Sequence, residues 1–396
     1  MRVATGTFVV AAILAAGGCT TGARPVEAPA VARTVDVAAP DGVTLKGTLY
    51  ASASPGPAVL LLHQCDDRRT VWDPLGTRLA AAGVSALPID YRGYGESGGA
   101  PHEKLSNEQL QSIITNTWPG DFDAALAFLS RQTGVDASRI GAAGGSCGVN
   151  NVLRLAKRHA NVKALALLAG PADREARAVI EAPGAPPVFA AAAADDRYGD
   201  FVLVGAWQFG ISPRSESRFA QYADGGHAAV VFKAHPDLAD QLAQWFGAVL
   251  KDTPASLPTT NGVPLAPAVM QGVKQIDQPG GAAAMLARRT SPSGKAPADP
   301  ALPEYIVNWL GYEHLGSKDN AVALDIMKLN AASYPSSANA QDSLGDAYLA
   351  AGDTASALAA ARRTLELLDA DTTDTAERKA LIRKGAEDKI ARLSKR

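Results

Sequence analysis

Cysteine is scarce in this sequence: the 396 residues contain only Cys19, Cys65 and Cys147. Three cysteines cannot build a disulfide-rich scaffold, and none of them forms a CxxC pair or a Cys/His cluster with the spacing of a zinc site. The sequence therefore implies no metal. An excess of charge of one sign is also missing, because the formal net charge is −2. Without a general electrostatic attraction to phosphate groups, we expect no nucleic-acid partner.

The start of the chain lacks a hydrophobic run long enough to span a membrane as a mature helix. Its apolar stretch, residues 7–16 (TFVVAAILAA), is short and follows a positive charge at Arg2. This combination is typical of a secretory signal peptide. We predict a signal peptide at residues 1–18, followed at residues 19–33 by a tether rich in alanine and proline.

The junction between these two segments, AAGGCT, resembles the lipobox of bacterial lipoproteins, in which a cysteine that follows small residues becomes lipidated. This resemblance implies lipidation of Cys19. Ala16 departs from the pattern, because leucine usually stands three residues before the cysteine. We expect a protein held by lipid on the periplasmic side of the cell envelope, with secretion as the second choice.

Between residues 34 and 251, segments typical of strands alternate with segments typical of helices. Alternating apolar and polar residues on both sides of the PDG turn at residues 40–42 predict a hairpin. Continuous apolar runs such as residues 58–63 (AVLLLH) predict strands buried on both faces. The alternation predicts an α/β fold, in which helices cover both faces of a mostly parallel sheet.

After a linker at residues 252–265, the sequence contains a helical repeat with an offset of 34 residues. Identical residues recur at seven pairs of positions: Leu310/Leu344, Gly311/Gly345, Leu315/Leu349, Asp319/Asp353, Ala321/Ala355, Ala323/Ala357 and Leu324/Leu358. A period of 34 is that of tetratricopeptide repeats, whose paired helices need small residues where they touch. We predict an all-α, tetratricopeptide-like domain at residues 266–396, which could dock a protein or peptide partner.

The segment GGSCG places two candidate nucleophiles, Ser146 and Cys147, side by side. It fits the pattern G-x-S-x-G, with Gly144 and Gly148 on either side of the serine. In a sharp strand-to-helix turn, the positions two before and two after the nucleophile almost touch, so both must be small. A tip at Cys147 would put the branched side chain of Val149 in one of these positions. The pattern therefore predicts Ser146 as the nucleophile.

With this motif, residues 34–251 resemble the α/β-hydrolase family, in particular dienelactone-hydrolase-like and peptidase-like esterases. The resemblance rests on LLLHQ, DYRGYGES, GGSCG, ADD and DGGH, and on the chain order Ser…Asp…His that this fold uses. It implies hydrolysis of a small-molecule carboxylic ester, or of an amide or thioester, without a cofactor. True dienelactone hydrolases have a cysteine in the place of Ser146, so their specific reaction is not implied. The helical domain resembles the tetratricopeptide tails fused to various bacterial serine hydrolases.

A serine hydroxyl needs a base within hydrogen-bond reach, and this base needs an acid that orients it. We predict His227 as the base, because it follows a predicted strand in a flexible loop (DGGH). The alternative, His235, stands at the start of the last helix of the domain and is better suited to a structural role.

The orienting acid is predicted to be Asp196. Family members often have G-x-x-D at this place, and Ala193 occupies the glycine position in this chain. Because that glycine is missing, the neighbouring Asp195 stays as an alternative. Asp173, after an earlier strand, is the more distant choice.

The resemblance also implies an oxyanion hole made of two backbone N–H groups. One belongs to Cys147, the residue after the nucleophile. The other comes from the loop after the third strand, from Cys65 or else from Gln64. Two residues whose N–H groups point at one oxygen could lie close enough for a disulfide, which an extracytoplasmic compartment permits. We hypothesise a Cys65–Cys147 disulfide, with two small buried thiols as the alternative.

Residues 99–118 are the expected source of pocket-lining side chains, although nothing in them specifies a substrate. A second hypothesis is a catalytically inactive binding protein, in which the hydrolase fold has lost turnover and the helical domain recruits a partner protein. The intact set of nucleophile, base and acid favours the enzyme.

Overall fold

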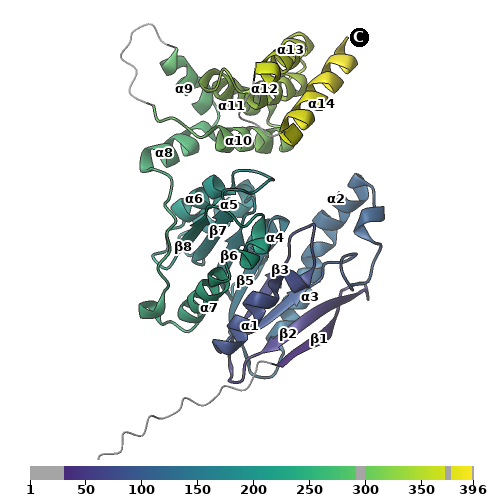
Figure 1. The fold of residues 1–396 in the computed structure, drawn as a ribbon, viewed down its shortest axis with the longest axis vertical. Helices are drawn as coiled ribbons and strands as arrows, with labels where there is room; N and C mark the ends of the chain where they lie inside the picture. Colours follow the sequence, from purple (N-terminus) through teal and green to yellow (C-terminus); the bar gives the residue numbers. More distant parts are fainter. Residues whose placement is uncertain (1–30, 291–298, 371–375, 395–396) are drawn as a thin grey trace, which may run out of the picture.

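The computed structural model describes residues 31–290, 299–370 and 376–394. In this part of the chain, an eight-stranded sheet with helices on both faces is followed by an all-helical tail (Figure 1). The predicted α/β class and the helical C-terminal region are thereby confirmed. The predicted signal peptide, most of the predicted tether and Cys19 lie outside the described residues.

The sheet joins an N-terminal hairpin to a parallel part, as predicted. β2 is antiparallel to both of its neighbours, β1 and β4, and all other neighbouring strands are parallel. The order across the sheet is β1-β2-β4-β3-β5-β6-β7-β8. The strands are β1 (Val31–Ala38), β2 (Thr44–Ala51), β3 (Gly56–Leu62), β4 (Ser85–Ile89), β5 (Val135–Gly145), β6 (Val162–Leu168), β7 (Val188–Ala193) and β8 (Arg218–Tyr222).

The first strand begins earlier than the sequence suggested. β1 starts at Val31, and residues 31–33, which we had assigned to the tether, pair with the end of β2. Arg33, for example, pairs with Leu49. The short VAR segment contains too few residues to show a strand alternation by itself, so its structure depends on pairing with β2.

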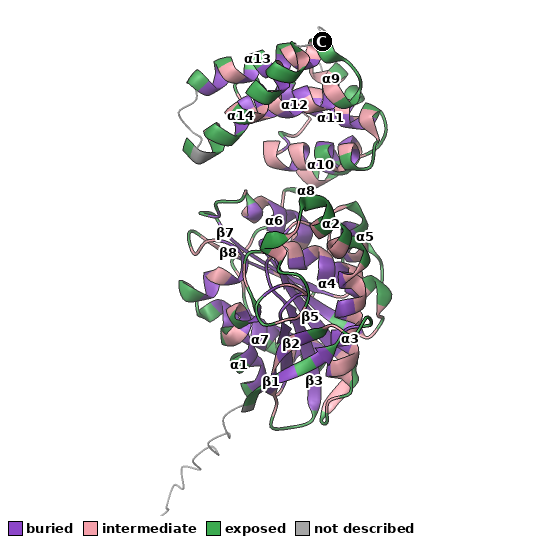
Figure 2. Cartoon of the chain, turned by 90° about the vertical axis from the view of Figure 1, so that its right-hand side faces the viewer, coloured by how far each residue is buried: buried purple, intermediate pink, exposed green. Residues whose placement is uncertain are grey.

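The parallel strands separate two hydrophobic cores, one on each face of the sheet. In β3 the alternate residues Val59 and Leu61 belong to one core, whereas Leu60 and Leu62 belong to the other. Successive side chains of a strand point to opposite faces, so a strand covered on both sides must be apolar throughout. Figure 2 shows the sheet as a buried layer inside the helices.

Helices α1 and α7 cover one face, and α3, α4 and α5 cover the other. α6 lies over β7 and β8, and α2 packs against α3 outside the main layers. These helices are α1 (Asp73–Ala81), α2 (Asn107–Asn116), α3 (Trp118–Ser130), α4 (Cys147–Arg158), α5 (Arg174–Glu181), α6 (Phe201–Ile211) and α7 (Asp237–Leu250).

The sequence analysis missed α6, because this helix has apolar residues around most of its circumference. One side packs on the sheet, where Ala206 contacts the core around Phe219. Another side packs against the tail, where Trp207 joins a cluster that contains Ile306. A helix that is buried on several sides shows no amphipathic periodicity.

The tail is built from seven helices in its described part, and its central helices repeat as hairpins. α10 and α12 begin 34 residues apart, and so do α11 and α13. Gly311 on α10 packs against Met327 on α11 so closely that a Cβ would lie 2.8 Å from the sulfur. The helices are α8 (Pro267–Ile276), α9 (Gly281–Arg289), α10 (Glu304–Gly316), α11 (Asn320–Ser333), α12 (Ala338–Ala350), α13 (Thr354–Ala370) and α14 (Ala376–Leu393).

None of the helices in the described ranges has the length and apolar character needed to cross a lipid bilayer.

Candidate active site

Ser146, the predicted nucleophile, lies near the point of the sheet where the strand order reverses. β3 is flanked by β4 on one side and by β5 on the other. In open α/β sheets, such a switch point leaves a crevice at the carboxyl ends of the strands, where ligands bind. Cys65 follows β3 and Ser146 follows β5, so both lie at this edge.

The turn from β5 into α4 is as tight as the G-x-S-x-G motif requires. Ser146 lies between the two elements with a φ of 52° and a ψ of −120°, a conformation that residues with a side chain rarely adopt. A Cβ at Gly144 would clash with the carbonyl oxygen of Gly148, and a Cβ at Gly148 would lie 2.7 Å from the carbonyl oxygen of Leu62. Crowding therefore explains both glycines, and Ser146 occupies the tip of the turn while Cys147 begins the helix.

His227 and Asp196 meet in a buried hydrogen bond. Nδ1 of His227 lies 2.7 Å from Oδ2 of Asp196, and the side chains are 8% and 0% exposed. Because a carboxylate only accepts hydrogen bonds, Nδ1 carries the proton and Nε2 is free to act as an acceptor. The other carboxylate oxygen of Asp196 accepts the backbone N–H of Tyr198 at 3.0 Å. Both oxygens of the acid are thus fixed.

The alternative acids stabilise other parts of the fold. Asp195 accepts the backbone N–H groups of Gly225 and Gly226 at 3.2 and 2.8 Å, so it holds the loop that leads to His227. Asp173 caps α5 by accepting an N–H of the first turn. In the described part of the chain, neither carboxylate forms a hydrogen bond with His227.

The alternative base, His235, supports the same loop. Its Nε2 lies 2.7 Å from Oδ1 of Asp224, and its ring stacks on Tyr222 with 4.2 Å between the ring centroids. These contacts tie the end of β8 to the segment before α7. His235 therefore stabilises the loop structure, whereas His227 is hydrogen-bonded to Asp196.

The loop that carries His227 comes up against the nucleophile turn. A Cβ at Gly145 would lie 3.3 Å from the Cβ of Ala228. The residue before Ser146 and the residue after His227 are therefore neighbours in space. Among the described residues, the Ser146 hydroxyl forms no hydrogen bond. In free enzymes such bonds are often long and tighten only when the substrate is bound.

Cys65 and Cys147 form a disulfide in the structure, and their Cα atoms are 5.9 Å apart. The bond links the loop after β3 to the first residue of α4. The backbone N–H groups of both cysteines have no acceptor among the described residues. A helix N-terminus also favours negative charge. The two N–H groups are therefore available to an anionic oxygen next to Ser146.

If Cys65 and Cys147 are the predicted oxyanion donors, replacing both with alanine should lower kcat by about tenfold to a hundredfold, because the two N–H groups would no longer be held together. The disulfide closes a long loop, with a sequence separation of 82. Its loss should also lower the free energy of unfolding by about 4 kcal/mol. The measurement is ester hydrolysis and urea unfolding of the double variant. Wild-type protein treated with dithiothreitol should show the same loss of kcat, and the treated variant should show no further change.

Gln64 is a buried polar residue that connects the two loops around the nucleophile. Its side chain accepts the backbone N–H of Ala229 at 3.3 Å, and Gln64 is 1% exposed. The loop after β3 is thereby joined to the segment that follows His227. In the sequence, Gln64 was considered only as an alternative oxyanion donor. Its contact with Ala229 could not be predicted, because the two residues are 165 positions apart in the chain.

Tyr198 was missed in the sequence and lies directly over the predicted base. Its ring meets the His227 ring edge to face, with centroids 4.5 Å apart. Its hydroxyl donates to Oδ2 of Asp66 at 2.9 Å, next to Cys65. Tyr198 therefore bridges the loop after β7 and the loop after β3. Its position two residues after Asp196 was the only signal in the sequence.

His63, at the end of β3, is a structural histidine. Its Nδ1 lies 2.6 Å from the carbonyl oxygen of Gln64, and its Nε2 accepts the backbone N–H of Tyr91 at 3.1 Å. The ring also stacks on that of Tyr91. These contacts fix the neutral tautomer with the proton on Nδ1. Burial lowers the pKa of His63 to about 4.

The stability of the protein should fall between pH 7 and pH 5 in part through His63. In the unfolded chain this histidine binds a proton near pH 6.5, whereas in the folded protein it stays neutral down to a pKa of about 4. Above pH 6.5 His63 therefore has no pH-dependent effect on the free energy of unfolding. Below pH 6.5 it lowers this free energy increasingly, by about 2 kcal/mol at pH 5. The difference in free energy of urea unfolding between wild type and His63→Gln should shrink by this amount. Parallel pH curves would contradict the prediction.

The segment expected to line the pocket, residues 99–118, contains α2 and ends in the hydrophobic core. Trp118 is 1% exposed and packs against Tyr91 and Phe122. Its role is therefore packing. His102 stacks on Tyr94, with 3.8 Å between ring centroids. A pocket-lining role for the exposed part of this segment stays a prediction.

A cavity of about 840 Å³ lies elsewhere, where α8 crosses α6. Trp207, Met270 and Lys274 are among its lining residues, and Ser146, His227 and Asp196 are not. Its position at the junction of the sheet domain and the tail separates it from the triad-like arrangement.

The strand order, the nucleophile turn and the His–Asp pair place the sheet domain in the α/β-hydrolase fold class. No protein-family model matches the chain. A thiohydrolase of Aspergillus aculeatus is 31% identical over 102 residues, which are 26% of this chain and 30% of that protein. An uncharacterized protein of Mycobacterium tuberculosis is 35% identical over 126 residues, 31% of this chain and 41% of that protein. The chain thus matches less than half of the length of these relatives.

Among solved structures, an esterase of Pyrococcus furiosus is similar to part of this chain. The TM-score is 0.44 at 17% sequence identity, and the match covers 56% of this chain and 94% of that chain.

Proposed function

We propose that the protein is a serine hydrolase that cleaves a carboxylic ester or thioester of a small molecule. The observation that carries this proposal is the buried His227–Asp196 pair, which a loop brings beside the turn that presents Ser146. A base oriented by a buried acid is what a serine hydroxyl needs to become a nucleophile. The similarity to a thiohydrolase supports thioesters as one substrate class to be tested.

In the proposed reaction, Ser146 Oγ attacks the carbonyl carbon of the substrate while His227 Nε2 takes the hydroxyl proton. Asp196 stabilises the imidazolium that forms. When the tetrahedral intermediate collapses, the same proton passes to the leaving alcohol or thiol, and an acyl-serine remains. Water then attacks this acyl-enzyme with His227 as base, which releases the acid and restores the serine.

The negative charge of the tetrahedral intermediate would be held by the N–H groups of Cys65 and Cys147. The disulfide fixes the distance between these two residues before the substrate arrives. Donors that need no rearrangement during the reaction stabilise a developing oxyanion most effectively. This is the role we assign to the bond between the two loops.

We further propose that the protein works outside the cytoplasm, anchored by lipid at Cys19 or secreted. A disulfide next to the proposed catalytic centre supports an oxidising compartment. Incorporation of labelled palmitate in wild type and its absence in Cys19→Ala would establish the anchor. A protein or peptide partner of the helical tail is likewise a proposal, and the two repeated hairpins support it.

A fluorophosphonate probe tests the proposed activity directly. The probe should form one adduct, and mass spectrometry of the digested protein should locate it on Ser146. A series of p-nitrophenyl esters and matched thioesters of increasing acyl length should then define the substrate class. An inactive binding protein would show neither labelling nor turnover, and this result would favour the alternative function.

A further inference from the structure

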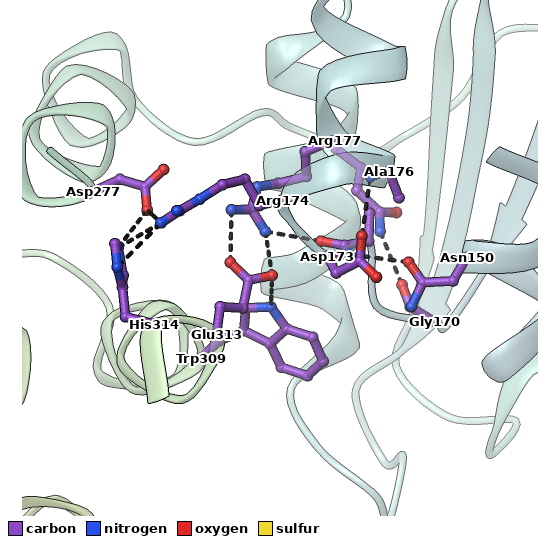
Figure 3. Close-up of polar contacts among 12 residues, drawn as sticks. Asn150, Gly170, Asp173, Arg174, Ala176, Arg177, Asp277, Trp309, Glu313 and His314 are labelled. Atoms are coloured by element: carbon purple, nitrogen blue, oxygen red, sulfur yellow. Dashed lines mark hydrogen bonds and ion pairs between the residues drawn. The ribbon is translucent and has the colours of Figure 1, made fainter. Parts of the chain in front are cut away.

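The helical tail is docked on the sheet domain through a buried ion pair. Both oxygens of Glu313 on α10 accept from the guanidinium of Arg177 on α5 at 2.7 Å. The two side chains are 11% and 5% exposed. Trp309 donates to the same carboxylate at 2.8 Å, and Figure 3 shows this network between the two domains. A buried pair with two parallel bonds fixes orientation as well as distance.

Apolar packing adds to this polar contact. The guanidinium of Arg177 lies over the ring of Trp207, 4.4 Å from its centroid. Trp207 on α6 in turn belongs to the same hydrophobic cluster as Ile306 and Leu310 on α10. The tail and α6 therefore share one core, in which α6 and α10 pack against each other.

α6 directly follows the loop that carries Asp196. The loop, residues 194–200, is largely exposed, and Tyr198 within it is 50% exposed. At its end, Gly199 lies against Tyr305 of α10: a Cβ there would lie 2.8 Å from Cζ of the tyrosine and even closer to its hydroxyl. Tyr305 also packs against the core of the sheet domain. One wall of this loop is thus supplied by the tail.

The electrostatics agree with this proximity. Burial raises the pKa of Tyr305, and the carboxylates of Asp196 and Asp200 raise it further, while Arg378 opposes them. The carboxylate of Asp196 therefore lies close enough to the Tyr305 hydroxyl to disfavour its ionisation. An exposed loop with few apolar contacts of its own needs a packing partner such as Tyr305 to keep a fixed position.

We propose that Tyr305 on α10 of the tail is a positioning residue for the proposed active site. Its side chain holds the 194–200 loop in place, and the loop in turn holds Asp196 against His227. This inference rests on the proposed serine hydrolase function. It gives the tail a role in the reaction itself, separate from any partner that the tail binds.

Tyr305→Ala in the full chain should lower kcat by about tenfold to a hundredfold, because a misplaced orienting group costs rate even when the distortion is small. KM should change little. Tyr305→Phe should stay within about threefold of wild type, since the ring that packs on the loop is kept. The matched control is Tyr348→Ala, which removes a half-buried tyrosine from the tail on α12, away from the sheet domain. It should leave kcat unchanged.

A double-variant cycle separates positioning from general damage. If Tyr305 acts through Asp196, Asp196→Asn should lower kcat by a smaller factor in the Tyr305→Ala background than in wild type. If Tyr305→Ala only damages the structure, the fold-losses in kcat of the two single variants should multiply in the double variant. If Tyr305→Ala does not fold, as judged by circular dichroism, Tyr305→Leu takes its place in the same cycle. Multiplying factors, or an unchanged kcat in the folded variant, would overturn the inference.

The same assay distinguishes this inference from the function on which it rests. Wild type and Ser146→Ala are measured beside the tail variants with a p-nitrophenyl ester. If turnover in wild type does not depend on Ser146, the proposed function and the inference both fall. If it depends on Ser146 and the Tyr305 variants behave like Tyr348→Ala, only the inference falls.

Discussion

Ser146→Ala should lower kcat for ester hydrolysis by about 10⁴-fold to 10⁶-fold, because the variant has no hydroxyl to form the acyl-enzyme. The serine is held at the tip of the turn by its φ of 52° and by the crowded glycines around it. Alanine fits the same backbone and removes one oxygen atom. The fold should therefore be unchanged, and the loss should appear in kcat. Initial rates with a short p-nitrophenyl ester measure it.

The matched control is Ser138→Ala, on the same strand but far from the turn. Among the described residues, the hydroxyl of Ser138 hydrogen-bonds only to the side chain of Asp136, in the exposed part of β5. This variant should keep full activity. A Ser146→Ala protein that retains more than about a tenth of the wild-type rate would contradict the nucleophile assignment, since the loss of a nucleophile costs far more than tenfold.

The second large effect is expected for Asp196→Asn, which should lower kcat by about 10³-fold to 10⁴-fold. An amide in this position can donate as well as accept, so it no longer forces the proton of His227 onto Nδ1. The imidazole then loses both its orientation and the charge that stabilises its protonated form. Because the side chain of Asp196 is completely buried against His227, water cannot replace the missing carboxylate.

Asp195→Asn is the control that the chain itself offers for this prediction. The two residues are neighbours with the same side chain, but in the described part of the chain Asp195 accepts only from the backbone of Gly225 and Gly226. The amide oxygen of asparagine can still accept such a bond, so kcat should fall by less than about tenfold. If the two variants lost equal activity, or if Asp195→Asn lost more, Asp196 would not be the orienting acid.

One part of the site and the class of the fold could be predicted from the sequence because their cause is local. The G-x-S-x-G pattern predicts a turn in which only small residues fit beside the nucleophile, and the structure has this crowding at Gly144 and Gly148. The alternation of apolar runs and helical patterns predicted the α/β sheet, because each buried strand must be apolar on both faces.

The choice between Asp195 and Asp196 needed the tertiary structure. The sequence lacked the glycine that fixes the register of the family pattern, and both carboxylates stand at the end of the same strand. In the folded protein one of them is buried against an imidazole and the other is exposed against a glycine loop. The backbone conformation of the turn sets the direction in which each side chain points. This conformation cannot be predicted from the residue types alone.

The contacts of Tyr198 and Tyr305 were also invisible in the sequence. Tyr198 reaches Asp66 across 132 residues of chain, and Tyr305 comes from a helix of the other domain. Neither tyrosine belongs to a motif, and a tyrosine in a helix or loop is more often a packing residue than a functional one. Their relation to His227 and Asp196 arises only when separate elements pack together.

The tight turn at Ser146 and the 34-residue repeat of the tail could be predicted from the sequence, because each follows from a pattern of residue types along the chain. Three other features appear only in the folded protein: Asp196 and not Asp195 faces His227, Cys65 is bonded to Cys147, and α10 packs beside the 194–200 loop. These facts follow from the distances between segments far apart in the chain, and such distances are set by how the sheet, its loops and the tail share their buried surfaces.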